Sequence, residues 1–148
     1  SSRRRHTRYI SVTGVQTCAL PISAPDPALA GEEQVVETTR LMVEQIERRR
    51  AFYLALVHGQ AVADPRVSEV MDSVRDGSTD RVVAALGVPA EQRDVVRAWW
   101  AYTEDRALTW SAVPTGERPV PMVRLVEECV AALHALLDVS AWSRDPSR

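Results

Sequence analysis

Lysine is absent from this chain, and it has few cysteines and no long apolar run. All 18 basic residues are arginine, which matches codon bias in a high-GC bacterial genome and says little about mechanism. No apolar run reaches the ~18 residues that a membrane helix needs, so the sequence predicts no membrane span. Cysteine occurs only at Cys18 and Cys129. Two cysteines are too few for a disulfide framework, and we expect a cytoplasmic protein.

Sequence patterns of catalytic and metal sites are also missing. The chain has no HExxH, GxSxG, paired-cysteine or glycine-rich phosphate motif. Glu127 and Glu128 are adjacent, so on a helix their side chains point about 100° apart and do not form a carboxylate pair. Glu104 and Asp105 diverge in the same way, and we interpret all four as surface acids. We therefore predict no enzyme activity, no metal and no cofactor.

The first 23 residues differ from the rest, because they hold four arginines and no acidic residue. From Val12 to Ile22, VTGVQTCALPI is similar to the translation of a common short-read sequencing adapter. SRRRHTR, from Ser2 to Arg8, is similar to the adjoining part of the same oligonucleotide. We therefore expect residues 1–23 to be a disordered artefact that replaces the true N-terminus. The alternative is a genuine basic targeting or DNA-binding arm.

Without residues 1–23 the chain keeps 14 basic and 20 acidic residues, a net charge of −6. An acidic domain lacks the electrostatic footprint of a phosphate-backbone binder. A domain of this size buries roughly two-thirds of its surface, which suffices for one core. Cys129 remains as the only cysteine of this part, and we interpret it as a small core hydrophobe.

Apolar spacing along the remaining chain predicts an all-α domain with no strand pattern. We expect a linker over residues 24–30, the domain over 31–139 and a disordered tail over 140–148. Within the domain, Gly77 and Ser78 weaken the middle of one long helix. Five helices are expected, over residues 31–48, 51–58, 65–86, 90–111 and 120–139.

The stretch from Ala90 to Ser111, AEQRDVVRAWWAYTEDRALTWS, predicts an unusually aromatic helix. At ~100° per residue, one side of it carries Trp99, Tyr102, Arg106 and Trp110. Other apolar side chains widen this stripe, so the helix is expected to be covered on more than one side.

Large aromatic side chains with polar groups, beside one fixed positive charge, suggest a ligand pocket. We expect it to hold a mostly apolar small molecule, with any anionic group near Arg106. The alternative is a structural Arg106, paired with a carboxylate of a neighbouring helix such as Asp72 or Asp76, among aromatic residues that are simply core. The candidate ligand-binding residues are Trp99, Tyr102, Arg106, Trp110, Met71 and Tyr53.

Three segments resemble the C-terminal domain of TetR-family transcriptional regulators, over about Glu32 to Leu137. RRRAFYLALVHGQAVADPRVSEVMD is similar to the family's short aromatic helix, glycine, Asp-Pro and long helix. RAWWAYTEDRALTWSA is similar to its aromatic penultimate helix, and GERPVPMVRLVEECVAALHALL to its final helix. The order and lengths of the helices carry the resemblance more than any single motif does.

This resemblance implies a regulator whose N-terminal helix-turn-helix binds operator DNA and whose C-terminal domain dimerises and binds an effector. The helix-turn-helix half is not in this sequence, so operator DNA is expected as a partner of the full-length parent only. We expect this chain to form a homodimer through its last two helices and to bind a small hydrophobic effector. The candidate dimer residues are Trp100, Leu108, Val126, Cys129, Val130, Leu133 and Leu137.

Other interpretations stay open. Each candidate dimer residue could instead belong to the core of the single chain. The whole domain could be a helical interaction module without a ligand. A small helical enzyme or metal carrier is less favoured, because ligand spacings such as ExxH are missing.

Overall fold

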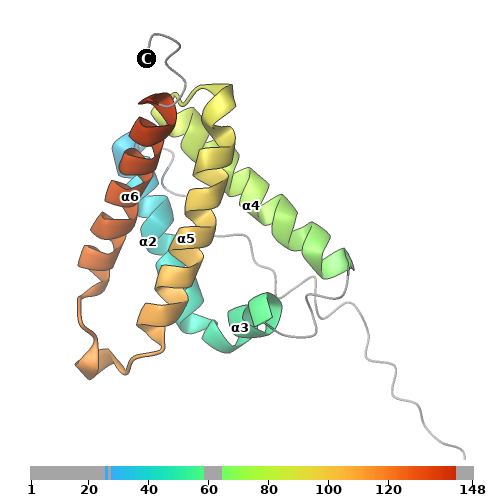
Figure 1. Cartoon of the computed structure of the whole chain (residues 1–148). Helices are drawn as coiled ribbons and strands as arrows, with labels where there is room; N and C mark the ends of the chain where they lie inside the picture. The colour runs from blue at the N-terminus through green and yellow to red at the C-terminus, as the bar shows by residue number, and fades with distance from the viewer. Residues whose placement is uncertain (1–25, 27, 59–64, 143–148) are drawn as a thin grey trace, which may run out of the picture.

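The computed structural model describes residues 26, 28–58 and 65–142, which form an all-α fold (Figure 1). No strand occurs among these residues, which confirms the predicted all-α character. Residues 1–23 and 143–148, where we expect an artefact and part of the tail, lie outside the described residues. The five helices are α2 (Glu32–Arg48), α3 (Arg50–His58), α4 (Pro65–Leu86), α5 (Arg93–Ser111) and α6 (Met122–Trp142); two short 3₁₀ helices are η2 (Ala90–Gln92) and η3 (Thr115–Glu117).

Helix α5 lies at the centre of the fold and contacts α2, α3, α4 and α6 (Figure 1). Trp99 and Trp100 are fully buried on it, and their rings lie 4.5 Å apart between centroids. Each tryptophan removes roughly 150–250 Å² of surface from water, so this pair contributes much of the apolar burial. Other helices of the same chain therefore cover α5 on more than one side, whereas a ligand or a partner subunit as a further covering surface stays a prediction.

The ends of α2 and α4 follow from local chemistry. Two carboxylates, Glu32 and Glu33, occupy the first turn of α2, where the helix dipole favours negative charge. Helix α4 stops because Gly87 adopts the left-handed region, with φ of 63°. The Val88 amide then donates to the carbonyl of Val83 at 3.0 Å. This bond pattern is the Schellman motif, which glycine permits without strain.

Two helix ends differ from the expected ones. Helix α6 begins after Pro121, whose carbonyl accepts hydrogen bonds from the Arg124 and Leu125 amides at 3.0 and 3.2 Å. It then continues past Val139 to Trp142, into the expected tail. That stretch contains no glycine or proline to end a helix. Helix α4 is continuous across Gly77, so this glycine weakens the helix without ending it.

One arginine holds the α5–α6 connection against the end of α2. The Arg118 side chain is only 11% exposed, and its Nη1 lies 2.6 Å from Glu47 Oε1. Its Nε donates to the Val113 carbonyl at 3.1 Å, and its guanidinium stacks 3.9 Å from the centre of the Trp110 ring. A planar, fully charged group can make all three contacts at once, which fixes the loop.

Candidate functional site

The aromatic side chains of α5 divide between two sides of the helix. Trp99 and Trp110 lie in the core, where each indole N–H donates to a backbone carbonyl next to or within α6. Trp99 Nε1 lies 2.6 Å from the Cys129 oxygen, and Trp110 Nε1 lies 2.8 Å from the Val120 oxygen. These two predicted ligand residues therefore attach α6 to α5.

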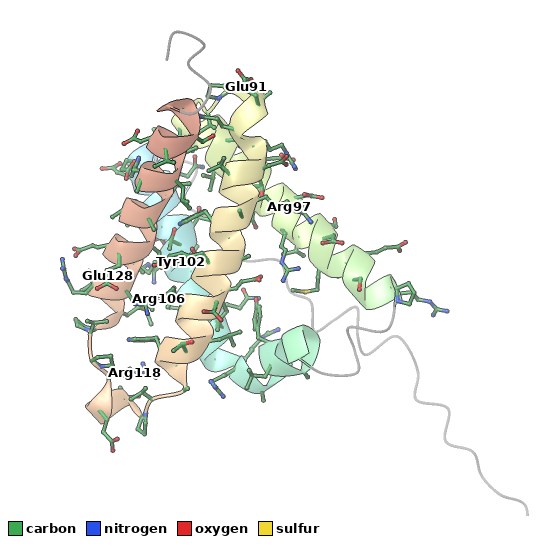
Figure 2. The ribbon with its side chains drawn as sticks, viewed as in Figure 1. Glu91, Arg97, Tyr102, Arg106, Arg118 and Glu128 are labelled. Carbon is green, nitrogen blue, oxygen red and sulfur yellow. The ribbon has the colours of Figure 1, made fainter. Side chains whose placement is uncertain are left out.

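Tyr102 and Arg106 point outward instead, on the side where α5 and α6 lie next to each other (Figure 2). Tyr102 is 40% exposed. Arg106 Nη2 lies 3.0 Å from Glu128 Oε2 of α6. The alternative of a structural arginine paired with a carboxylate of a neighbouring helix thus describes Arg106, but the partner is Glu128. Asp72 and Asp76, the partners named for it, bind other arginines of α5. The four α5 residues of the predicted pocket are thus not brought together.

Tyr53, another candidate ligand residue, lies in a polar cluster between α3, α4 and α5. Burial raises the pKa of its hydroxyl, and the nearby Glu104 carboxylate raises this pKa further. Glu104 forms a two-point contact with Arg75, with Nη2–Oε2 at 2.8 Å and Nε–Oε1 at 3.3 Å. Met71 is half-buried one turn before Arg75 on α4. We call Tyr53, Arg75 and Glu104 the polar cluster.

The interpretation of Glu104 as a surface acid is wrong. Only 7% of this residue is exposed, and its charge is compensated by Arg75, as a buried carboxylate requires. Trp100 lies one turn earlier on the same side of α5 and is 1% exposed. Within the described residues its Nε1 has no hydrogen-bond partner. A buried donor without an acceptor is rare in folded proteins and marks this side of α5 as unusual.

The candidate dimer residues lie mostly inside the single chain. Six of them are buried, and Leu137 is half-buried against the same core. This is the placement that the core alternative expects for each of them. The buried six are Trp100, Leu108, Val126, Cys129, Val130 and Leu133.

Small exposed side chains occupy the outside of the last two helices. On α5 these include Ala98, one turn before Tyr102. On α6, Ala131, Ala135 and Val139 are exposed and recur every four residues, so they share one side of the helix. We call one surface the outer face. It consists of Ala98, Tyr102, Ala131, Ala135 and Val139, with the Arg106–Glu128 pair.

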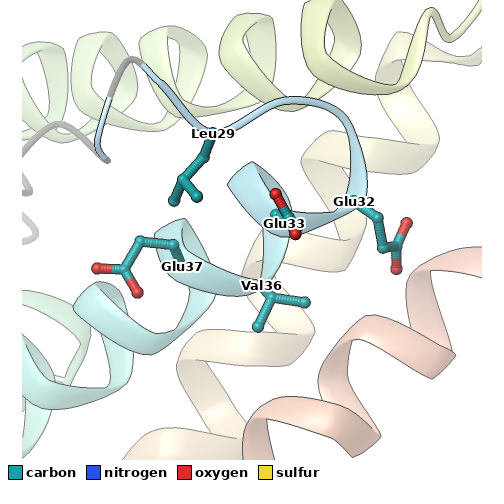
Figure 3. Close-up of a pocket in the computed structure, with 5 residues that line it drawn as sticks. All are labelled: Leu29, Glu32, Glu33, Val36 and Glu37. Carbon is teal, nitrogen blue, oxygen red and sulfur yellow. The ribbon is translucent and has the colours of Figure 1, made fainter.

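A shallow hollow lies at the start of α2, and none of the candidate ligand residues lines it (Figure 3). Its volume is about 340 Å³, and Glu32, Glu33, Glu37, Leu29 and Val36 line it. Two of its carboxylates already have partners. Glu32 lies 2.8 Å from His134 Nε2, and Glu37 binds Arg40 at 2.6 Å. We assign no function to this hollow.

Within the part of the chain that the structure describes, histidine, cysteine, aspartate and glutamate side chains form no group of three or more that could hold a metal ion. In the same part, none of the helices combines the length and apolar character needed to cross a membrane.

Comparison with known proteins assigns no family. No protein-family model, no curated protein and no solved structure matches this chain. The resemblance to TetR-family regulators therefore stays a prediction.

Proposed function

We propose that this chain is the sensing and dimerisation domain of a one-component transcriptional regulator of the TetR type. In this proposal two copies pair through the outer face, and an effector binds beside the polar cluster. The observation that carries the proposal is the outer face itself. It spans the last two helices, which contact each other along their length (Figure 1).

The composition of the outer face suits helix packing. Ala98, Ala131 and Ala135 are small enough to let a second pair of helices approach at the usual interaxial distance of roughly 8–10 Å. Tyr102 offers a large apolar surface with a polar end, which is favoured in interfaces. In a twofold dimer each copy presents the same patch. The two copies of α5 and α6 then form a four-helix bundle.

The effector proposal rests on the side of α5 that faces α3 and α4. There the buried Trp100 N–H has no acceptor among the described residues, while Arg75 and Glu104 compensate each other. A mostly apolar molecule with one acceptor oxygen suits such a site better than a charged one. It would pack against Met71 and Tyr53, which the sequence already suggests as ligand residues.

Light scattering tests the dimer. At micromolar concentration we expect twice the chain mass of 16.4 kDa. Ala135→Glu places a charge in the outer face and should give the monomer mass. Ala84→Glu is the matched control, because Ala84 is exposed on α4, and it should remain dimeric. A wild-type chain that is monomeric would overturn the proposed pairing.

Tryptophan fluorescence tests the effector site. A panel of neutral apolar ketones and amides should give a saturable change that Trp100→Phe weakens. Arg106→Ala separates two positions for the ligand. An unchanged response supports the site beside Trp100, and a lost response places the ligand beside Arg106 on the outer face. No saturable response to the panel would contradict effector binding beside Trp100.

A further inference from the structure

The two halves of α4 are attached to the fold by different chemistry. From Ser78 onward the helix buries Ser78, Thr79 and Val82, each at most 3% exposed. Between Pro65 and Asp76, none of the side chains that the structure describes is buried. Figure 1 shows this N-terminal end of α4 diverging from the other helices. The α4 side chains that pack in or against the apolar core, Val82, Val83, Ala85 and Leu86, all lie in the C-terminal half.

Charged contacts hold the N-terminal half. Asp72 lies 3.0 Å from Arg97, and Asp76 binds both Arg93 and Arg97. Asp80 continues the series at 2.9 Å from Arg93. The aspartates recur every four residues on α4 and the arginines every four on α5, so the two rows face each other. We call these five residues the charge ladder (Arg97 is labelled in Figure 2).

Between the two halves the helix is locally weak. Gly77 lowers helix propensity, and a Cβ added there would meet nothing within 4 Å. The Thr79 hydroxyl donates to the Arg75 carbonyl at 2.8 Å. Such side-chain bonds to the preceding turn often bend helices. Flexing at this point would leave the packing of Val82 intact.

We propose that residues 65–76 of α4 form a flap that detaches from α5 about Gly77 while residues 78–86 stay docked. Detachment breaks the Asp72 and Asp76 contacts of the charge ladder and the Arg75–Glu104 pair. It uncovers Glu104 and Tyr53, each 7% exposed when the flap is closed. The flap, which itself carries Arg75, is thus a lid over Glu104 and Tyr53. The lid follows from the contacts of α4 alone and does not depend on dimerisation.

The chemistry of the ladder makes the lid sensitive to ionic strength. Exposed ion pairs are individually weak, and salt screens them. Apolar packing is not weakened by salt in this way. Raising the salt concentration should therefore loosen residues 65–76 and leave residues 78–86 in place.

Hydrogen exchange on the full chain tests the flap. We expect amides of residues 70–76 to exchange about tenfold faster in 1 M than in 0.05 M sodium chloride, because the screening length falls from more than 10 Å to about 3 Å. Amides of residues 79–86 should change little. The double variant Asp72→Asn/Asp76→Asn should exchange fast in residues 70–76 at both salt concentrations. Asp94→Asn is the control, because Asp94 is exposed on α5 outside the ladder.

An equal salt response along residues 70–86 would show that α4 moves as one unit and would overturn the flap. Unchanged exchange in the double variant would do the same. If that variant loses its helical circular dichroism, the double variant Arg93→Gln/Arg97→Gln takes its place in the test, because it breaks the charge ladder from α5 instead of α4. Light scattering of the same samples reports dimerisation separately, so the two proposals fail independently.

Discussion

The indole N–H of Trp99 donates to the backbone carbonyl of Cys129 across 2.6 Å, in a part of the core where both residues are 0% exposed. Trp100 is equally buried, yet its N–H has no partner in the described part of the chain. Two adjacent tryptophans on one helix therefore differ in a single hydrogen bond.

This pair gives an internally controlled prediction. Trp99→Phe and Trp100→Phe remove the same volume from the same core, but only Trp99→Phe removes a hydrogen bond. We expect each variant to lower the free energy of unfolding by about 1–3 kcal/mol. Trp99→Phe should cost about 1 kcal/mol more than Trp100→Phe. Urea unfolding curves measure the difference, and equal losses would mean that the Trp99–Cys129 bond adds nothing to stability.

Glu104→Gln should be clearly destabilising. The variant leaves the Arg75 guanidinium without its charged partner beside buried Tyr53. Breaking a buried pair costs about 3–5 kcal/mol, and because the Arg75 side chain is 30% exposed we expect about 1–3 kcal/mol. Glu127→Gln breaks the exposed pair with Arg124 and should cost less than about 0.5 kcal/mol. Thermal unfolding of the two variants side by side checks the contrast.

Arg118→Lys tests the arginine that holds the α5–α6 loop. Lysine keeps the charge near Glu47 but cannot stack as a plane on Trp110 while donating to Val113. We expect a loss of about 1–2 kcal/mol, together with a changed emission of the indole at Trp110. Arg124→Lys, at an exposed position of α6, serves as the control and should leave Tm unchanged. Matching Tm values for the two variants would show that stacking is unimportant.

Stability should decline in acid, partly through Asp76. Partial desolvation acts to raise the pKa of this carboxyl, but hydrogen bonds from Arg93 and Arg97 outweigh it and hold the pKa below its usual range. A carboxyl with a lowered pKa in the folded state stabilises the fold above its unfolded pKa, about 3.9, and this contribution is lost as the pH falls.

Asp76→Asn should therefore be less stable than the wild type at pH 7, and the difference should shrink below about pH 4. Denaturant curves between pH 3 and 7 measure it. Asp94→Asn should show no such convergence, since none of the described ion pairs includes Asp94. A constant difference for Asp76→Asn across this range would contradict the lowered pKa.

Much of the fold follows from sequence patterns, whereas the contacts between helices do not. Helical spacing and the glycine at position 87 suffice to predict α4 and its end. The same wheel places Trp99 and Tyr102 on one side of α5, but they lie about 60° apart on it. That angle is enough for one residue to face the core and the other the solvent. Which of them is buried depends on where α6 packs, and one helix's sequence does not contain that information.

Glu104 is a second residue whose burial the sequence of its own helix does not reveal. A carboxylate next to Asp105 matches a surface pattern. Its partner Arg75 lies 29 residues earlier, and no sequence feature links the two residues. The charge ladder had a usable signal, because aspartates and arginines both recur at intervals of four. Recognising it would have required knowing that α4 and α5 are neighbours.

The central position of α5 has a mechanical consequence. One side of this helix carries Arg93 and Arg97, another carries Trp99, and a third carries Tyr102. A small rotation of α5 about its own axis would shift all three sides together. Movement at the proposed α4 flap would thus reach the proposed pairing surface through the rigid body of α5, without a relay of side chains.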